Sequence, residues 1–254
     1  MAKRLSDLSG WATKAEWPRV LCPDCLEGSL ALESVSHILD PKSVAQLERY
    51  ARNLEGRDEA SGTFTGVLRC DNHVCKRGVV VAGTWGDWWD VDDDGRTLLV
   101  EHFHVGYMEP PARLLLTPKR TPSKVVDAIE TASKVLWSSP DAAATHLRLA
   151  VEELLTSLHV KRFTLTRARK RRRLTTQERL DLLEATHPNL VHTLEAVKWI
   201  GNEGTHSSGL EVRDVEKGAK LLELALRDQY DTSEAELHAT AKDINRRKGL
   251  PRAR

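Results

Sequence analysis

Short runs in which apolar and polar residues alternate occupy much of the first hundred positions and predict a β-rich region. The runs lie at residues 30–35, 63–68, 79–85 and 97–105. One helical pattern interrupts them after Asp40-Pro41, where a favoured N-cap residue is followed by proline at the first helical position. We therefore expect an N-terminal β-rich domain with a short helical insertion, ending at residue 118.

Beyond residue 118 the apolar positions recur every three to four residues, which predicts helices. Helix starts are marked at Thr121-Pro122 and Ser139-Pro140, and Thr175 with Glu178 forms the pattern of a capping box. The first two of these helices are joined by a short turn and should pack antiparallel. The expected fold class is α+β, with a β-rich domain (1–118), an all-α bundle (119–231) and a basic, mobile tail (232–254).

Composition and charge narrow the function classes. The chain has 254 residues, 40% of them hydrophobic, which is enough for a real core. Lys and Arg number 38 against 37 Asp and Glu, so any attraction to nucleic acid has to be local. The first residues lack the apolar run of a signal peptide, and no stretch approaches the roughly 20 apolar residues of a membrane span. We expect a soluble, cytoplasmic protein.

Four cysteines occur in two close pairs, Cys22 with Cys25 and Cys70 with Cys75. In a reducing cytosol this spacing favours a metal site over disulfides. Four thiolates close the tetrahedral coordination of Zn²⁺ and leave no position for a substrate water, so the predicted site is a structural zinc ribbon. His73 is an alternative ligand, and reduced thiols without metal are the competing interpretation.

An acidic segment matches the written pattern of a calcium-binding EF-hand loop, with Asp90, Asp92, Asp94, Gly95 and Glu101 at the required offsets. An EF-hand loop lies between two helices, whereas the flanking residues here alternate as strands do. Asp-Gly between two extended runs is also a strong hairpin signal. We therefore interpret the segment as a hairpin turn with a solvated acidic tip and disfavour Ca²⁺.

A dense basic run follows the second predicted helix of the bundle. Such a run on a nearly neutral chain suits contacts with phosphates, because each neutralised phosphate releases counterions. A disordered, solubilising insertion is the competing interpretation. The candidate nucleic-acid-binding residues are Arg167, Arg169, Lys170, Arg171, Arg172 and Arg173.

The segment from Lys198 to His206 carries the most distinctive combination of side chains. If it is helical, Lys198, Asn202 and His206 lie four residues apart on one face, so that a cation, an amide and an imidazole point the same way. Gly201 and Gly204 each cost about 1 kcal/mol in a helix interior and imply that backbone passes close by. The alternative is structural, with Asn202 and His206 capping a helix end.

This segment resembles the GN-x-x-x-H box of a bacterial family of unknown function found near restriction and phage-defence genes. That family is similar to the HEPN superfamily of helical RNA-binding domains and metal-independent ribonucleases. The resemblance spans residues 110–230, and a similar pair of cysteine motifs recurs in the family. It implies an HEPN-like helical bundle, a homodimer and a part in antiviral defence.

In catalytic HEPN domains an arginine, usually followed by asparagine, precedes the histidine. The resemblance implies that the histidine assists attack of a ribose 2′-hydroxyl on the adjacent phosphate, while the arginine stabilises the added charge without a metal. Asn202 and His206 match this motif, but Gly201 stands at the place of the arginine. Lys198 and Arg148 are the candidate replacement cations, although lysine lacks the bidentate geometry of arginine toward phosphate.

Arg148 and Glu152 are spaced one helical turn apart in the second helix of the predicted bundle. They either form an ion pair on a solvated face or turn toward the box, and their spacing does not decide between the two. The candidate catalytic residues are accordingly Lys198, Arg148, Glu152, Asn202 and His206.

Three functions fit these features. The leading interpretation is an HEPN-like regulatory or binding module of an anti-phage or restriction system that associates with RNA or DNA and has little catalytic activity. The second is a metal-independent endoribonuclease that uses His206 and Asn202 with a relocated cation. The third is a zinc-ribbon subunit that docks a larger defence complex.

Overall fold

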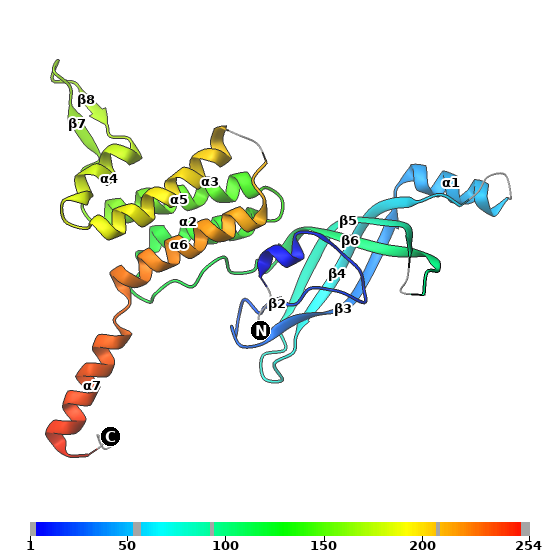
Figure 1. Cartoon of the computed structure of the whole chain (residues 1–254), viewed down its shortest axis with the longest axis horizontal. Helices are drawn as coiled ribbons and strands as arrows, with labels where there is room; N and C mark the ends of the chain where they lie inside the picture. The colour runs from blue at the N-terminus through cyan, green and yellow to red at the C-terminus, as the bar shows by residue number, and fades with distance from the viewer. Residues whose placement is uncertain (1–3, 53–56, 92–93, 207–208, 250–254) are drawn as a thin grey trace.

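The chain forms a curved β-sheet from its N-terminal part and a group of helices from its C-terminal part, which lie end to end (Figure 1). The computed structural model describes residues 4–52, 57–91, 94–206 and 209–249, and of His206, Glu234 and Ala235 only the backbone. Residues 110–122 connect the two parts without regular secondary structure. The predicted order of a β-rich region followed by a helical one is confirmed.

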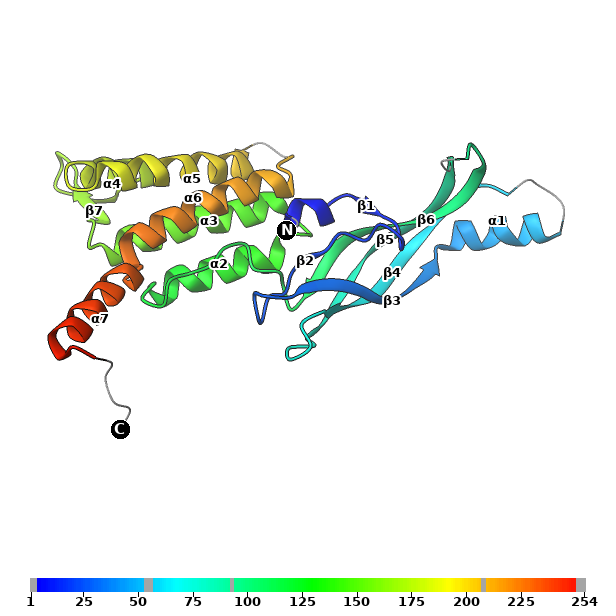
Figure 2. The same ribbon diagram turned by 60° about the horizontal axis from the view of Figure 1, so that its bottom comes forward.

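The sheet is an antiparallel half-barrel (Figure 2). Its four long strands are β3 (Ser29–Leu39), β4 (Ala60–Cys70), β5 (Gly78–Val91) and β6 (Thr97–Glu109). The short strands β1 (Trp11–Ala12) and β2 (Val20–Leu21) lie at the edges, in the order β1-β6-β5-β4-β3-β2. The alternating run in this part of the sequence is predicted to begin at residue 63, whereas β4 already pairs with β5 from Ala60.

Aromatic side chains fill the inner face of the sheet. Phe64 on β4 packs against Phe103 on β6 with ring centroids 5.2 Å apart, and Trp17 contacts both rings. Along β4, buried Phe64 and Leu68 alternate with exposed Thr63 and Thr65, which is the period of two that a half-buried strand requires. The apolar alternation in the sequence therefore predicts the inner face correctly.

Helix α1 (Pro41–Ala51) begins where the sequence indicates, because the Asp40 carboxylate accepts a hydrogen bond of 2.8 Å from the backbone N–H of Ser43. The acidic segment connects two paired strands, as the hairpin prediction requires. Strands β5 and β6 pair up to Val91 and Thr97, so strands flank this turn where an EF-hand has helices. Asp92 of the acidic pattern lies outside the described residues.

The central helix of the C-terminal part is α3 (Pro140–Ser157), which packs against α2, α5 and α6. Its neighbours are α2 (Ser123–Val135), α4 (Thr176–Glu184), α5 (Pro188–His206) and α6 (Val212–Tyr230). The predicted starts are confirmed: the Ser139 side chain caps α3, and Thr175 with Glu178 forms the capping box of α4. None of the described helices has the length and apolarity needed to cross a membrane.

Two segments differ from their predicted structures. The basic run forms a β-hairpin of β7 (Phe163–Leu165) and β8 (Arg171–Arg173), which projects from the helices (Figure 1). Its arginine-rich second strand lacks the apolar alternation that would have marked it. The predicted tail forms α7 (Ser233–Arg247), a largely exposed helix that points away from the others. The weak apolar periodicity of this segment fits a helix that buries little surface.

The N-terminal residues and the first cysteine loop join the sheet to the helices. The short helix η1 (Leu5–Leu8) packs against α6, and the buried Glu216 carboxylate accepts a 2.9 Å hydrogen bond from the backbone N–H of Leu5. In the connecting segment, Arg113 Nε donates to the carbonyl oxygen of Pro23 at 2.6 Å. These polar contacts tie the N-terminal residues to α6 and the first cysteine loop to the connecting segment.

Candidate metal centre and cationic cleft

The four cysteines meet at one end of the sheet, where Cys70 ends β4 and the other three lie in the loops that follow β2 and β4. The Sγ atoms of Cys22 and Cys75 are 3.8 Å apart, those of Cys25 and Cys70 are 3.7 Å apart, and all four lie within 4.8 Å of one another. A tetrahedral ion with metal–sulfur bonds of about 2.3 Å requires sulfur–sulfur distances of about 3.8 Å. The predicted clustering is confirmed, and the cluster has the geometry to hold a metal ion.

Backbone geometry around the cluster makes room for the sulfur atoms. In each loop the residue after the second cysteine has a left-handed φ, 59° at Leu26 and 49° at Lys76, which turns the chain back toward the next strand. A Cβ atom at Gly28 would lie only 2.5 Å from the Sγ of Cys70, so a side chain there would displace the sulfur. His73 is exposed and is not part of the four-residue cluster.

The four thiols do not all have the same acidity. Burial raises the pKa of Cys70 to about 12 and raises the pKa of Cys22 as well. Backbone N–H donors, that of Gly28 first, lower the pKa of Cys25 to about 7. The buried thiols therefore need a nearby positive charge to ionise at neutral pH, and a metal ion bound by the four sulfurs would supply it.

The GN-x-x-x-H box lies on an uninterrupted helix, because α5 continues to His206. The box glycines face α3. A Cβ at Gly201 would lie 2.4 Å from the Cβ of Arg148, and one at Gly204 would lie 2.5 Å from the carbonyl oxygen of Asp141. The glycines therefore allow α3 and α5 to approach closely. The helical spacing puts Asn202 and His206 on one side of α5, although the His206 side chain is not among the described atoms.

Lys198, the first candidate cation, is buried at the contact between α5 and α4. It is only 4% exposed, and its Nζ donates to Oε1 of Gln177. The same amino group lies 3.7 Å from the Glu195 carboxylate and 3.8 Å from the centroid of the Trp199 ring. Its charge is thus engaged within the protein, whereas the Arg148 side chain is 30% exposed. Arg148 is the more accessible of the two candidate cations.

Arg148, Glu152 and Arg173 meet in a cleft of about 530 Å³ between α3, β8 and α4, which we call the cationic cleft. Glu152 accepts hydrogen bonds from Arg173 at 2.9 Å and from the Thr176 hydroxyl at 2.8 Å, and lies 3.7 Å from the Nη2 of Arg148. The other lining residues are Thr145, His146, Leu149, Leu174, Thr175 and Arg179. Of the two alternatives left open by the spacing of Arg148 and Glu152, the structure has them near each other as an ion pair, and the fold adds Arg173 and Thr176.

Arg179 is a structural member of this cleft that we did not single out from the sequence. It is 3% exposed and donates to the carbonyl oxygens of Glu152 and Val160 and to the Thr156 hydroxyl. These bonds fasten α4 to the end of α3. A signal was present, because Arg179 shares the helical spacing of the buried Leu180 and Leu183.

The hairpin β7–β8 holds its basic residues in two different ways. At its base, Arg172 donates two hydrogen bonds to the Glu178 carboxylate, at 2.9 and 2.6 Å, and the Arg171 guanidinium lies 3.7 Å from the centroid of the Phe163 ring. Toward its tip, the side chains of three basic residues form no ion pair with any residue that the structure describes. These are Arg167, Arg169 and Lys170.

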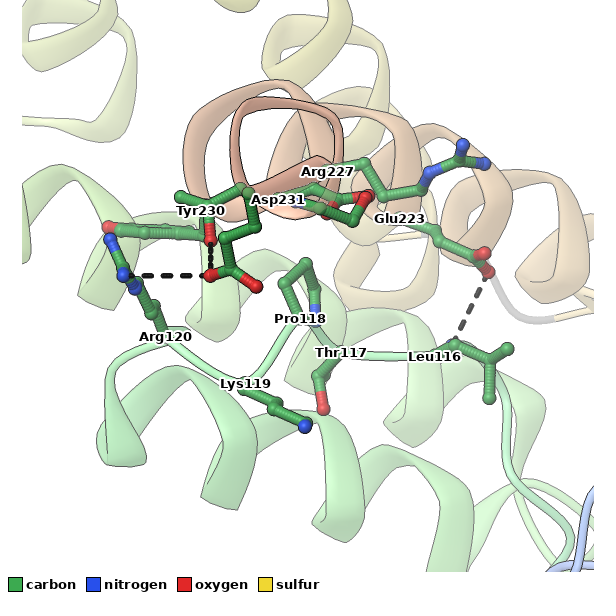
Figure 3. Close-up of a pocket in the computed structure, with 12 residues that line it drawn as sticks. Leu116, Thr117, Pro118, Lys119, Arg120, Glu223, Arg227, Tyr230 and Asp231 are labelled. Carbon is green, nitrogen blue, oxygen red and sulfur yellow. Dashed lines mark hydrogen bonds and ion pairs between the residues drawn. The ribbon is translucent and has the colours of Figure 1, made fainter. Parts of the chain in front are cut away.

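A second hollow of about 510 Å³ lies between the connecting segment and the junction of α6 with α7 (Figure 3). Arg120 lies 3.8 Å from the Glu236 carboxylate, which also accepts a 2.7 Å hydrogen bond from the Thr232 hydroxyl. Three basic and three acidic residues line this hollow, so it has no preference for anions. They are Lys119, Arg120, Arg227, Glu223, Asp231 and Glu236.

Comparison with known proteins assigns a family to the helical part. No curated protein and no solved structure matches the chain. The model of a family described as a domain of unknown function, DUF4145, matches residues 130–247. These residues run from α2 to the end of α7, and they include the GN-x-x-x-H box, the cationic cleft and the hairpin. The chain therefore carries a DUF4145 domain in its helical part, preceded by a β-sheet with a four-cysteine cluster.

Proposed function

We propose that the helical part is an HEPN-like module that binds RNA through hairpin β7–β8 and the adjoining cationic cleft. The hairpin is the observation that carries this proposal. Residues 161–173 contain eight Lys and Arg and no Asp or Glu, on a chain whose net charge is only +1. The hairpin projects into solvent (Figure 1), where a polyanion can reach it.

The free cations near the tip favour a phosphate backbone as the ligand. Arg167, Arg169 and Lys170 have no carboxylate partner among the described residues, so they bind a phosphate without first breaking an ion pair. Each phosphate that they neutralise releases counterions, which supports binding at moderate salt. Arg173, at the base of the same hairpin, extends this positive surface into the cleft.

The test compares two variants of equal charge. In one, Arg167, Arg169 and Lys170 are changed to Gln; in the other, the exposed Lys124, Lys134 and Lys220 are changed to Gln. Binding is measured by the fluorescence anisotropy of a labelled RNA at 0.1 M salt. At this salt, a phosphate contact to a single strand contributes about fivefold, so loss of three contacts weakens binding by about 100-fold. Equal affinities of the two variants would overturn the proposal.

We infer that the ion of the cysteine cluster is zinc and that its role is structural. Four thiolates suit this ion and close its coordination, which leaves no position for a substrate. Metal analysis of the purified protein tests this, with Cys22→Ser and Cys70→Ser as the variants. Each is expected to lose most of its zinc, and unchanged zinc content would refute the assignment.

A metal-independent endoribonuclease is the second candidate function, and the position of Arg148 favours it. The Cβ and Cδ of Arg148 lie beside Gly201, so this arginine extends from the place where the family motif has an arginine. In this function His206 accepts the proton of the ribose 2′-hydroxyl, Asn202 orients the substrate and Arg148 stabilises the charge on phosphorus. Labelled RNA incubated with the unmodified protein in the presence of EDTA should then be cleaved to products with 2′,3′-cyclic phosphate ends. The His206→Ala variant should leave the RNA intact. Intact RNA with both proteins would exclude cleavage.

The family resemblance also supports a homodimer within a bacterial defence complex, in which the sheet with its cysteine cluster docks a partner protein. Sedimentation of the purified chain tests the first part. A dimer sediments with twice the chain mass of 28.5 kDa, whereas a species of 28.5 kDa at every concentration would exclude it.

A further inference from the structure

Glu152 lies at the centre of the cationic cleft and joins three elements. One carboxylate oxygen accepts from Arg173 on β8, and the other accepts from Thr176 on α4 and lies 3.7 Å from Arg148 on α3. The Glu152 side chain is 18% exposed and lines the open cleft. A negative group with two oxygens therefore sits between two arginines at the edge of an open cleft.

Arg148 has hydrogen-bonding capacity that Glu152 does not use. Its Nε is buried and has no acceptor among the described residues, and its nearest carboxylate oxygen is beyond hydrogen-bond distance. The stem of Arg148 packs beside Gly201, where an added Cβ would lie 2.4 Å from the Cβ and 3.4 Å from the Cδ of the arginine. The buried Nε cannot be reached from outside, but the side chain as a whole is 30% exposed, so its Nη groups can donate to an acceptor that enters the cleft.

A phosphate group has the chemistry to be that acceptor. The planar fork of arginine matches phosphate as well as carboxylate, and phosphate offers more oxygens at a similar spacing. The cleft of about 530 Å³ has room for a phosphate together with an attached nucleoside. The Thr176 hydroxyl, which donates to Glu152 at 2.8 Å, lines the same cleft and becomes available as a donor when that carboxylate is displaced.

We propose that the cationic cleft is a binding site for one phosphate group, with Arg148 and Arg173 as its ligands, and that Glu152 is an internal counter-ion displaced when phosphate binds. This inference rests on the proposed RNA-binding function and deepens it. It assigns one phosphate to a defined pocket and makes Glu152 a competitor of that phosphate for the two arginines. The carboxylate keeps the arginines in position while the site is empty and competes with weak anions. Glu152 is therefore a regulator of affinity, and its removal strengthens phosphate binding.

Glu152→Gln is the decisive variant, and Glu153→Gln is its matched control. Glutamine keeps the size of the side chain and an oxygen that accepts from Thr176, while it removes the charge that Arg148 and Arg173 face. Glu153 is the next residue, is also half-buried and forms no ion pair with either arginine in the described part of the chain. Both variants change the net charge equally, so a difference between them reports on the cleft.

The first probe is inorganic phosphate, whose binding is measured by ³¹P NMR titration. The second is a pair of labelled RNAs of the same sequence, one with and one without a 5′-phosphate. Glu152→Gln removes a partly exposed carboxylate that competes with phosphate for the arginines. We therefore expect this variant to bind phosphate about threefold to fivefold more tightly than the unmodified protein. Glu153→Gln should match the unmodified protein, and Arg173→Gln should weaken phosphate binding. Stronger binding of the 5′-phosphorylated RNA identifies a terminal phosphate as the ligand, and equal binding identifies an internal phosphodiester.

Three results overturn the inference: unchanged or weaker phosphate binding by Glu152→Gln, equal tightening by Glu153→Gln, or unchanged binding by Arg173→Gln. Thermal unfolding of every variant shows whether it is folded, and Arg173→Gln is an independent test if Glu152→Gln does not fold. Failure of the proposed RNA-binding function gives a different result. Neither the unmodified chain nor any variant would then bind RNA, while inorganic phosphate could still bind Glu152→Gln more tightly than Glu153→Gln.

Discussion

Replacement of the two box glycines by alanine is expected to destabilise the helical part, although alanine is the better helix former. At Gly204 the new methyl group would lie 2.5 Å from the backbone carbonyl oxygen of Asp141 and 3.2 Å from the Cβ of Ala144. At Gly201 it would meet the Cβ of Arg148 at 2.4 Å. Neither neighbour is the flexible end of a side chain, so α3 has to move away from α5.

The size of the effect follows from two opposing terms. Alanine gains about 1 kcal/mol over glycine in a helix interior. Forcing a methyl group into a closely packed contact costs about 1–3 kcal/mol, and the upper end applies where the obstacle is backbone. We therefore expect a net loss of about 1–2 kcal/mol for Gly204→Ala, or roughly 3 °C in the unfolding midpoint for each kcal/mol in a protein of this size.

Gly218→Ala on α6 is the matched control. A Cβ there would meet its nearest atom, the Cδ1 of Ile200, at 3.4 Å, which is an ordinary contact. This variant keeps the gain in helix propensity and should be more stable by about 0.5–1 kcal/mol. Thermal unfolding followed by circular dichroism at 222 nm and urea titration measure all three variants. A Gly204→Ala protein as stable as the unmodified chain would refute the close packing of α3 on α5 that we infer.

Three further predictions concern the rest of the molecule. Removal of metal by a chelator should lower the unfolding midpoint of the sheet, and a Cys22→Ser protein should not respond further; equal responses of both proteins would contradict a structural metal. Hydrogen bonds from Arg172 lower the pKa of Glu178 to about 2, so the stability that this carboxylate contributes is present at neutral pH and is lost as the pH falls through about 2. Urea midpoints of Glu178→Gln and the unmodified chain should therefore differ at pH 7 and converge as the pH approaches 2, whereas a constant difference would argue against this ion pair. Glu216→Ala leaves the buried N–H of Leu5 without its acceptor and should cost about 1–3 kcal/mol, with faster hydrogen exchange at Leu5, and unchanged exchange would contradict this contact.

Local signals in the sequence predicted much of the fold. The caps at Asp40, Ser139 and Thr175 mark helices that start where expected, because each side chain satisfies backbone N–H groups of its own helix. The cysteine pairs likewise predicted a cluster, since close spacing along the chain brings two sulfurs of each loop together. The sequence did not predict the hairpin β7–β8. Strand β8 consists of three arginines, so it has no alternation of apolar and polar residues that would mark it as a strand.

The candidate site was predictable only in part, because its contacts join distant segments. Helical spacing allows Arg148 to pair with Glu152, but the contact of Glu152 with Arg173 spans 21 positions and is made by the hairpin. Lys198 has the spacing of a functional cation, yet the packing of α4 on α5 buries it against Gln177. Sequence spacing alone cannot reveal which face of a helix another helix covers.

The salt dependence of RNA binding tests the central claim of an RNA-binding hairpin most directly. Each phosphate contact to a single strand contributes about 0.7 to the slope of log K against log salt concentration. Neutralisation of Arg167, Arg169 and Lys170 should therefore reduce this slope by about 2, whereas neutralisation of Lys124, Lys134 and Lys220 should leave it unchanged. If all three proteins have the same slope, the hairpin does not contact the phosphate backbone and the account is contradicted.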